Sequence, residues 1–144
     1  MENRTIEELQ SRQELLEGFH VMRYLRPQFT EQSYIALVEE AQKNETYRQF
    51  ALRVDGRIVA VIGFQPMITL YYGKYIWVCD LVTDIAFRSK GFGEQLLTFV
   101  HSLAKKEGFD RIALSSGLQR EHAHRFYEEK MGYERASFVF TKTL

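Results

Sequence analysis

Two segments near the amino end of the chain, residues 11–24 and 30–42, place apolar side chains at every third or fourth position. This spacing predicts two amphipathic α-helices. Thr30 is the expected N-cap of the second helix, although Ser33 stands three residues later, where a capping box usually has Glu. We expect the two helices to cover one face of a sheet.

From residue 47 the pattern becomes typical of β-strands. The segments YRQFALRV and RIVAVIGF flank the pair Asp55 and Gly56, which predicts a hairpin with a tight two-residue turn. A second turn at residues 72–74 leads into YIWVCDLVT, so we expect a meander of three antiparallel strands. The last strand is apolar almost throughout, which predicts burial on both of its faces.

An amphipathic helix is predicted to begin near Gly91 and to end at Gly108. The segment RIALSS predicts a further strand, so that strand, helix and strand form a right-handed βαβ crossover with two parallel strands. We expect a short helix over EHAHRFYEEK and a closing strand over residues 133–141. The predicted fold class is α/β, a mixed sheet that joins an antiparallel meander to a parallel βαβ crossover and has helices on its faces. The apolar stripe of the long helix comprises Phe92, Leu96, Leu97, Val100, Leu103 and Ala104.

Composition narrows the range of functions. A chain of 144 residues, 45% of them apolar, fits one globular domain, so we expect residues 1–144 to form a single domain. Lys+Arg and Asp+Glu number 19 each, and therefore no net field would hold the chain on nucleic acid or on anionic lipid. The amino end is acidic and polar, unlike a signal peptide, and no apolar run reaches the roughly 18 residues of a membrane span. We expect a cytoplasmic protein with no nucleic-acid or membrane partner.

Gly91 and Gly93 stand where the long helix begins. The first N–H groups of a helix have no partner within it, and they lie at the positive end of the helix dipole. Because glycine has no Cβ, a phosphate can approach this backbone closely, and Arg88 and Lys90 add positive charge. The alternative is that the glycines only ease a tight turn. GFGEQ lacks the Lys and Ser/Thr of a P-loop, and Leu96 replaces the third Gly or Ala of a Rossmann fingerprint.

Two motifs resemble those of a known family. RSKGFG, at residues 88–93, is similar to the Arg/Gln-x-x-Gly-x-Gly/Ala loop with which GNAT N-acetyltransferases bind the pyrophosphate of acetyl-CoA. AHRFYEEKMGY, at residues 123–133, resembles the A-x-x-x-Y-x-x-x-GF/Y segment of that superfamily, and the order of elements resembles it over nearly the whole chain. Residues 114–133 and the terminal FTKTL are similar to small-amine acetyltransferases such as the aminoalkylphosphonate type.

The resemblance implies how acetyl-CoA would be bound. The N–H groups from Ser89 to Glu94 would hold the pyrophosphate, and the backbone from Leu81 to Thr83 would pair with the pantetheine arm like an added strand. The Thr83 N–H would also polarise the thioester carbonyl. Arg120 stands where many members have an Asn, so its partner, either the coenzyme or an anionic group of the substrate, stays open. The implied coenzyme-binding residues are Leu81, Val82, Thr83, Arg88, Ser89, Lys90, Gly91, Phe92, Gly93, Glu94, Arg120, Ala123 and Phe126.

Two residues are candidates for proton transfer. An amine with a pKa of about 10 is mostly protonated at neutral pH, so a base must remove a proton before the nitrogen attacks the thioester. Asp80, a carboxylate in an apolar strand, is either that base or the partner of a cationic or backbone group. Tyr127 stands where the family has the tyrosine that faces the coenzyme sulfur, and it fits the acid that protonates the departing thiolate. Cys79, where some polyamine-acetylating relatives have a Glu, is expected to be a small core residue rather than an acyl carrier.

Two other groups of residues invite a functional interpretation. His122 and His124 lie two apart on a predicted helix and point to different sides, so we expect a solvated or capping role and no metal site. Tyr71, Tyr72 and Tyr75 either line the acceptor pocket or pack against one another.

The resemblance thus implies an acetyl-CoA-dependent N-acetyltransferase that acts on a primary amine of a small molecule by direct attack on the thioester. One alternative is a non-catalytic acetyl-CoA-binding sensor or regulatory module, which would need neither Tyr127 nor Asp80. Another is a protein N-acetyltransferase. Acetyl-CoA is the expected co-substrate, and a homodimer is one expected assembly.

Overall fold

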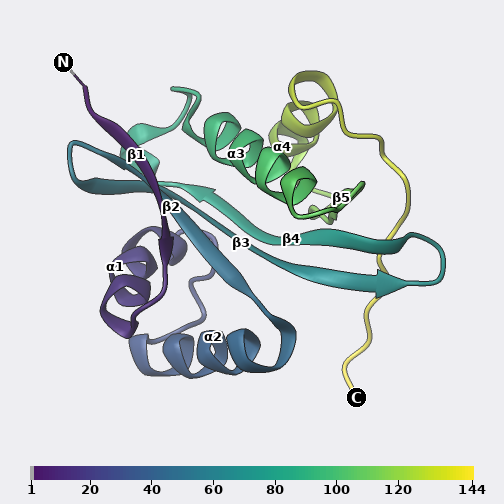
Figure 1. The fold of residues 1–144 in the computed structure, drawn as a ribbon, viewed down its shortest axis with the longest axis horizontal. Helices are drawn as coiled ribbons and strands as arrows, with labels where there is room; N and C mark the ends of the chain where they lie inside the picture. Colours follow the sequence, from purple (N-terminus) through teal and green to yellow (C-terminus); the bar gives the residue numbers. More distant parts are fainter. Residues whose placement is uncertain (1) are drawn as a thin grey trace. The chain divides into compact units, whose positions relative to one another are not determined.

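The structure is a computed structural model that describes residues 2–144. The chain divides into two compact units, Met1–Ala113 and Leu114–Leu144. Five strands form one sheet in the order β1-β2-β3-β4-β5 (Figure 1). The first four are antiparallel neighbours, and β5 is parallel to β4, so the predicted mixed α/β sheet is confirmed. The strands are β1 Arg4–Leu9, β2 Arg48–Val54, β3 Arg57–Thr69, β4 Gly73–Thr83 and β5 Ile112–Leu114.

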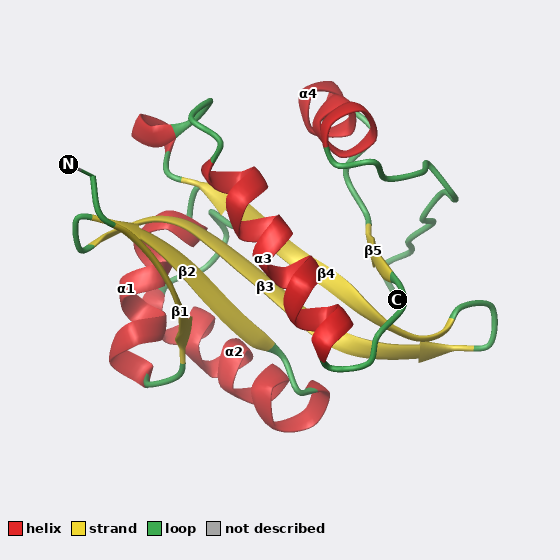
Figure 2. Ribbon diagram, turned by 45° about the horizontal axis from the view of Figure 1, so that its top comes forward, coloured by secondary structure: helices red, strands yellow, loops and turns green. Residues whose placement is uncertain are grey.

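The predicted meander is confirmed, beginning with the hairpin of β2 and β3. Asp55 and Gly56, at its turn, have φ angles of 50° and 85°. Two successive positive φ angles define the type I′ turn, whose twist matches that of the flanking strands. β3 and β4 then form a much longer hairpin, which runs out to residues 70–72 (Figure 2).

Both helices predicted near the amino end form as expected. α1 is Arg12–Met22 with Ser11 as N-cap, and α2 is Glu31–Glu45 with Thr30 as N-cap. Ser33 closes the capping box of α2, because its Oγ accepts from the Thr30 N–H at 2.9 Å. α1 and α2 lie on one face of the sheet and α3, Phe92–Lys106, lies on the other (Figures 1 and 2).

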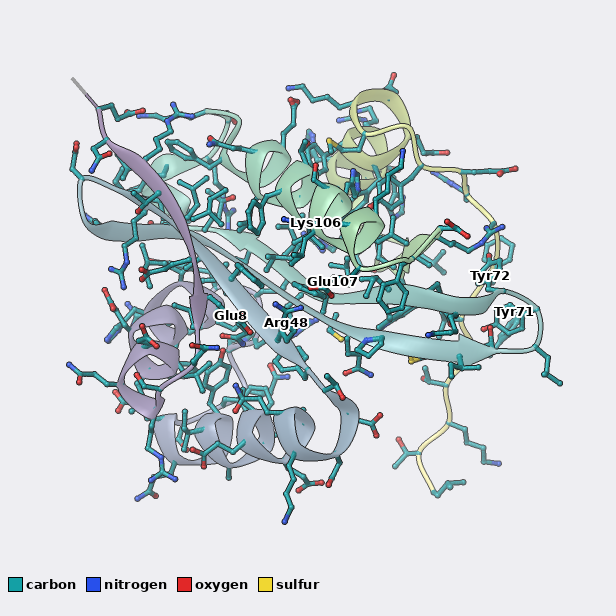
Figure 3. The ribbon with its side chains drawn as sticks, viewed as in Figure 1. Glu8, Arg48, Tyr71, Tyr72, Lys106 and Glu107 are labelled. Carbon is teal, nitrogen blue, oxygen red and sulfur yellow. The ribbon has the colours of Figure 1, made fainter. Side chains whose placement is uncertain are left out.

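The sequence pattern gave no sign of β1. Two of its six residues are acidic, and a short charged segment lacks the apolar alternation of a strand. Its side chains find partners only in the folded sheet: Glu7 pairs with Arg53 and Glu8 with Arg48, which are residues of β2. Arg48 also pairs with Glu107 at the end of α3 (Figure 3).

Three predictions about strands need correction. β5 covers only Ile112–Leu114 of the predicted segment RIALSS. β4 is half-buried over much of its second half rather than buried on both faces. No strand forms over residues 133–141, where Phe138 and Phe140 are 71% and 92% exposed. An alternating pattern favours a strand, but a strand also needs a neighbour for its backbone hydrogen bonds, which local sequence cannot supply.

The second unit contains the predicted short helix. α4 spans Glu121–Arg125 and continues into a π-helical turn, Phe126–Lys130. Among residues 2–144 no helix has the length and apolar character needed to cross a membrane.

Candidate active site

The loop between β4 and α3 exposes backbone N–H groups. Gly91 is the N-cap of α3 and adopts the left-handed conformation with φ 82°, and no side chain caps this helix. Ser89 also has a positive φ, of 64°. N–H groups around left-handed residues form a concave site for anions, to which α3 adds the positive end of its dipole. The backbone from Ser89 to Glu94 therefore has the geometry of a phosphate-binding loop.

The side chains around this loop leave the backbone accessible. Arg88 and Lys90 are exposed, and neither forms an ion pair within residues 2–144. The Arg88 Nε–H donates to the Thr83 carbonyl oxygen at 3.3 Å. A Cβ placed on Gly93 would lie 3.6 Å from Thr83 Oγ1, so the start of α3 and the end of β4 are adjacent. The structure thus brings the predicted loop together with the predicted strand end.

The end of β4 directs two N–H groups away from β3. The Asp84 N–H donates to the Val59 carbonyl oxygen at 2.7 Å. Because hydrogen-bonded residues alternate along an antiparallel pair, Val82 faces β3, whereas the N–H groups of Leu81 and Thr83 point to the opposite edge.

That opposite edge is only partly covered by β5. The Ile76 N–H donates to the Arg111 carbonyl oxygen at 3.0 Å, which places the start of β5 beside the first half of β4. With three residues, β5 ends before it reaches Leu81–Thr83. The N–H groups of Leu81 and Thr83, which the resemblance implies for the pantetheine arm, therefore lie beyond the end of β5.

A β-bulge lies directly before this segment. Gly63 pairs with Asp80 and Phe64 with Val78, which leaves Cys79 as an extra residue on β4. A bulge bends its strand and changes the direction of the side chains beside it, and bulges are common next to active sites. Here Cys79 and Asp80 both line the same pocket, on the side of α1 and α2.

Both carboxylate oxygens of Asp80 have partners. Oδ1 accepts from Arg26 Nε at 2.9 Å, and Oδ2 accepts from the Tyr47 hydroxyl at 2.7 Å. The Gln49 side-chain amide donates to the hydroxyls of Tyr47 and Tyr34, at 3.0 and 2.8 Å. Burial raises the pKa of Tyr34 to about 12, and burial together with the Asp80 charge raises the pKa of Tyr47 well above its usual value. Both phenols are therefore protonated at neutral pH.

Gly63 provides the space for this cluster. A Cβ at Gly63 would overlap the Tyr47 hydroxyl and would lie 2.8 Å from Asp80 Oδ2. Any side chain at this position would displace the hydrogen bond between Tyr47 and Asp80. Because Gly63 of β3 has no side chain, the Asp80 carboxylate of β4 can take its place beside the Tyr47 hydroxyl.

The cluster forms one wall of a pocket of about 240 Å³. Ligand pockets for drug-sized molecules begin at about 300 Å³, so this volume suits a smaller molecule. The remaining walls come from α1, α2, the loop between them and Gln65 of β3, and they are mostly apolar. The lining residues are Met22, Arg26, Gln28, Phe29, Tyr34, Leu37, Val38, Tyr47, Gln65, Cys79 and Asp80.

Cys79 has the properties of a core residue. Burial, aided by the negative charge of Asp80, raises the pKa of its thiol to about 12. The thiol is therefore protonated at neutral pH, and a protonated thiol is a weak nucleophile. This agrees with the prediction that Cys79 is not an acyl carrier.

Tyr127 lies in the second unit, in the π-helical turn. Its ring packs against Phe126 and Tyr133, with centroids 5.3 and 5.7 Å away. Burial raises the pKa of Tyr127, while the positive charge of Arg120 opposes the shift. The phenol is therefore protonated at neutral pH, as an acid must be. Arg120 and Ala123, predicted to contact the coenzyme, lie on the same short helical segment.

The remaining candidates have structural partners. His124 Nε2 lies 2.8 Å from the Gly117 carbonyl oxygen, and His122 Nδ1 accepts from Arg125 at 2.7 Å. Neither contact caps α4, and His122 is exposed, which fits the solvated alternative for that residue. Tyr71 and Tyr72 lie at the tip of the β3–β4 hairpin (Figure 3). Tyr72 packs on both Tyr71 and Tyr75, and none of the three tyrosines lines the pocket at Asp80.

Sequence analysis missed four members of the Asp80 cluster: Arg26, Tyr34, Tyr47 and Gln49. They come from the loop after α1, from α2, from the residue before β2 and from β2 itself, and no local motif connects them. One signal was available, since a polar Gln49 within the apolar run of β2 needs a hydrogen-bonding partner when buried.

The fold and the site define the protein as an acyltransferase of the N-acetyltransferase class. Residues 10–133 match the acetyltransferase (GNAT) family. An uncharacterized N-acetyltransferase, YhdJ of Bacillus subtilis (strain 168), is 38% identical over 137 residues, which are 95% of this chain and 96% of the relative. The chain belongs to the GNAT family.

One further sequence relative and one solved structure of the same fold are also similar to the chain. The aminoalkylphosphonate N-acetyltransferase of Salmonella typhimurium is 34% identical over 102 residues, which cover 70% of this chain and 64% of that protein. The aminoglycoside N-acetyltransferase AAC(6')-Iy, solved in complex with CoA, has the same fold, with a TM-score of 0.86 at 15% identity over 100% of this chain and 96% of the other.

Proposed function

We propose that the protein transfers the acetyl group of acetyl-CoA to a primary amine of a small molecule, in the cytoplasm. The main support is the arrangement of the first unit, where a phosphate-binding loop and a free strand edge lie next to a small pocket with a carboxylate. The Salmonella relative is named for aminoalkylphosphonates and the CoA-bound neighbour for aminoglycosides, and both kinds of acceptor are amines.

In the proposed reaction the amine nitrogen attacks the thioester carbon directly. The N–C bond forms, the C–S bond breaks, and the Thr83 N–H stabilises the negative charge that develops on the carbonyl oxygen. Asp80 accepts the proton that the ammonium must lose. Tyr127 gives its phenolic proton to the departing thiolate, and the second proton, which the nitrogen loses after its attack, restores the phenol.

The test is an acetylation assay with a free-thiol readout and a panel of small amines, polyamines, aminoglycosides and a lysine peptide. We expect turnover with at least one small primary amine and product acetylated on nitrogen. Turnover of the peptide alone would replace the small-amine proposal with protein acetylation. Binding of acetyl-CoA without turnover of any acceptor would instead identify a non-catalytic binding module.

A further inference from the structure

The pocket beside Asp80 contains two charges of opposite sign. Of its eleven lining residues only Arg26 and Asp80 are charged, and they form an ion pair at 2.9 Å. The pocket is therefore electrically neutral as a whole. A neutral pocket with one positive and one negative group is complementary to a molecule that carries one charge of each sign.

The two charges lie at different depths. The side chain of Arg26 is 37% exposed and that of Asp80 is 13% exposed, so a ligand that enters from solvent meets the guanidinium first. Arg26 donates through Nε to Asp80 and through Nη2 to the Cys79 carbonyl oxygen at 2.9 Å. A guanidinium has five N–H donors, so three of them make no hydrogen bond to residues 2–144.

This distribution is unfavourable for two common kinds of amine. A simple ammonium ion that approaches Asp80 would lie beside the guanidinium of Arg26, and like charges repel. A polycation would find one carboxylate, which already has a cationic partner. An amine that also bears a negative group avoids the repulsion, because that group can bind Arg26.

Building on the proposed N-acetyltransferase function, we propose that the acceptor is a zwitterion, a small primary amine joined by a short linker to a carboxylate, phosphonate or phosphate. Its ammonium group binds Asp80, and its anionic group binds the free N–H groups of Arg26. By binding Arg26, the anion weakens the ion pair and frees a carboxylate oxygen of Asp80 to accept the ammonium proton. The anionic group therefore contributes to turnover as well as to binding.

The test compares matched amines on the wild-type protein. β-Alanine and 2-aminoethylphosphonate are the zwitterions, propylamine is the simple cation, and 1,3-diaminopropane is the dication. We expect kcat/KM for the better zwitterion to exceed that for propylamine at least tenfold, with part of the difference in kcat. Equal kcat/KM for β-alanine, 2-aminoethylphosphonate and propylamine would overturn the inference while leaving the N-acetyltransferase intact. Turnover of an amine from the wider panel without turnover of either zwitterion would also overturn the inference, whereas turnover of no amine in either panel would refute the proposed function itself.

Variants at Arg26 separate recognition from stability. Arg26→Gln should lower kcat/KM for the zwitterion ten- to a hundredfold, the usual worth of a hydrogen bond to a charged group, without a matching loss for propylamine. Arg26→Lys keeps the charge but not the planar set of donors, so its kcat/KM for the zwitterion should lie between the values for the wild type and for Arg26→Gln. Arg23→Gln removes an exposed arginine outside the pocket. It should leave the ratio of kcat/KM for the zwitterion to kcat/KM for propylamine unchanged. An equal loss for both amines in Arg26→Gln and Arg26→Lys would show that Arg26 is structural, which would overturn the inference.

Discussion

At the scale of single residues, the environment of each ionisable group determines what it can do. Tyr127 and Tyr34 are both phenols whose pKa is raised by burial, yet they lie in different units and have different partners. Tyr34 lines the pocket at Asp80 and accepts a hydrogen bond from Gln49, which lies behind it. Tyr127 lies in a π-helical turn, a feature that is frequent at functional sites. A substitution that removes only the hydroxyl therefore tests a different property at each position.

Tyr127→Phe tests the proton donor. The variant keeps the ring and its packing but loses the phenolic proton, so turnover should fall by roughly 10² to 10⁴, the usual contribution of one acid or base. Binding of acetyl-CoA, measured by thermal shift, should be nearly unchanged. Turnover equal to that of the wild type would mean that water or another group protonates the thiolate.

Tyr34→Phe tests the pH dependence of stability. The pKa of Tyr34 is raised to about 12 in the folded state, whereas it lies near 10 in the unfolded state. The contribution of Tyr34 to the free energy of unfolding is therefore fully present below about pH 10 and is lost as the pH rises from about 10 to about 12. From pH 8 to pH 11 the wild type should lose about 1 kcal/mol more unfolding free energy than Tyr34→Phe, measured by urea denaturation. Tyr24→Phe, at an exposed tyrosine, is the control and should behave like the wild type. Equal losses in wild type and Tyr34→Phe would contradict the burial argument.

At the scale of elements, the N-cap glycine of α3 combines a left-handed conformation with a position in the candidate phosphate-binding loop. Gly91 has φ 82°, and nothing lies within 4 Å of a Cβ built on it. Its substitution therefore strains the backbone without a steric clash, and an acidic side chain there would place a negative charge in the phosphate-binding loop.

Gly91→Asp should abolish the thermal stabilisation by acetyl-CoA while the protein remains folded. Gly108→Asp is the matched control, because Gly108 lies beyond the other end of α3, has φ 94° and also has open space around it. The control carries the same charge and a similar backbone strain, and it should still be stabilised by acetyl-CoA. Loss of the shift in both variants would indicate a general effect on the fold, and retention in both would place the pyrophosphate elsewhere.

The elements also differ in how far sequence could predict them. The helices α1, α2 and α3 and the β2–β3 hairpin depend on local periodicity, caps and a turn dipeptide, and all of them form where expected. β1 was missed and residues 133–141 were wrongly expected to be a strand, since strand formation is decided by a partner that local sequence does not reveal.

At the scale of the whole molecule, ligand binding is coupled to stability. A ligand that binds only the folded state stabilises it by about 2.7 kcal/mol at a hundred times its dissociation constant. For a chain of this length the melting temperature should rise by roughly 5–10 °C. Acetyl-CoA should produce this shift in a thermal scan. Adenosine 3′,5′-bisphosphate should produce less, because it cannot pair with Leu81–Thr83. No shift at millimolar acetyl-CoA would contradict coenzyme binding by this protein.

From the sequence alone follow the fold class, the candidate phosphate-binding loop and the identity of Asp80 and Tyr127 as candidates. These conclusions depend on hydrophobic periodicity and on motifs of adjacent residues, which a linear chain displays directly. The family assignment agrees with them, because residues 88–93 and 123–133 are short contiguous signatures within the matched range.

Only the tertiary structure decided how Asp80 is surrounded. Arg26 is 54 residues away along the chain and Tyr47 is 33 away. They meet the carboxylate because the loop after α1 and the residue before β2 lie on the face of the sheet that α1 and α2 cover. The bulge at Cys79 and the space left by Gly63 depend on the register between β3 and β4. Ion pairs and buried hydrogen bonds between distant residues form only after the chain has folded, so no sequence period or spacing could have predicted the pair of charges that defines the pocket.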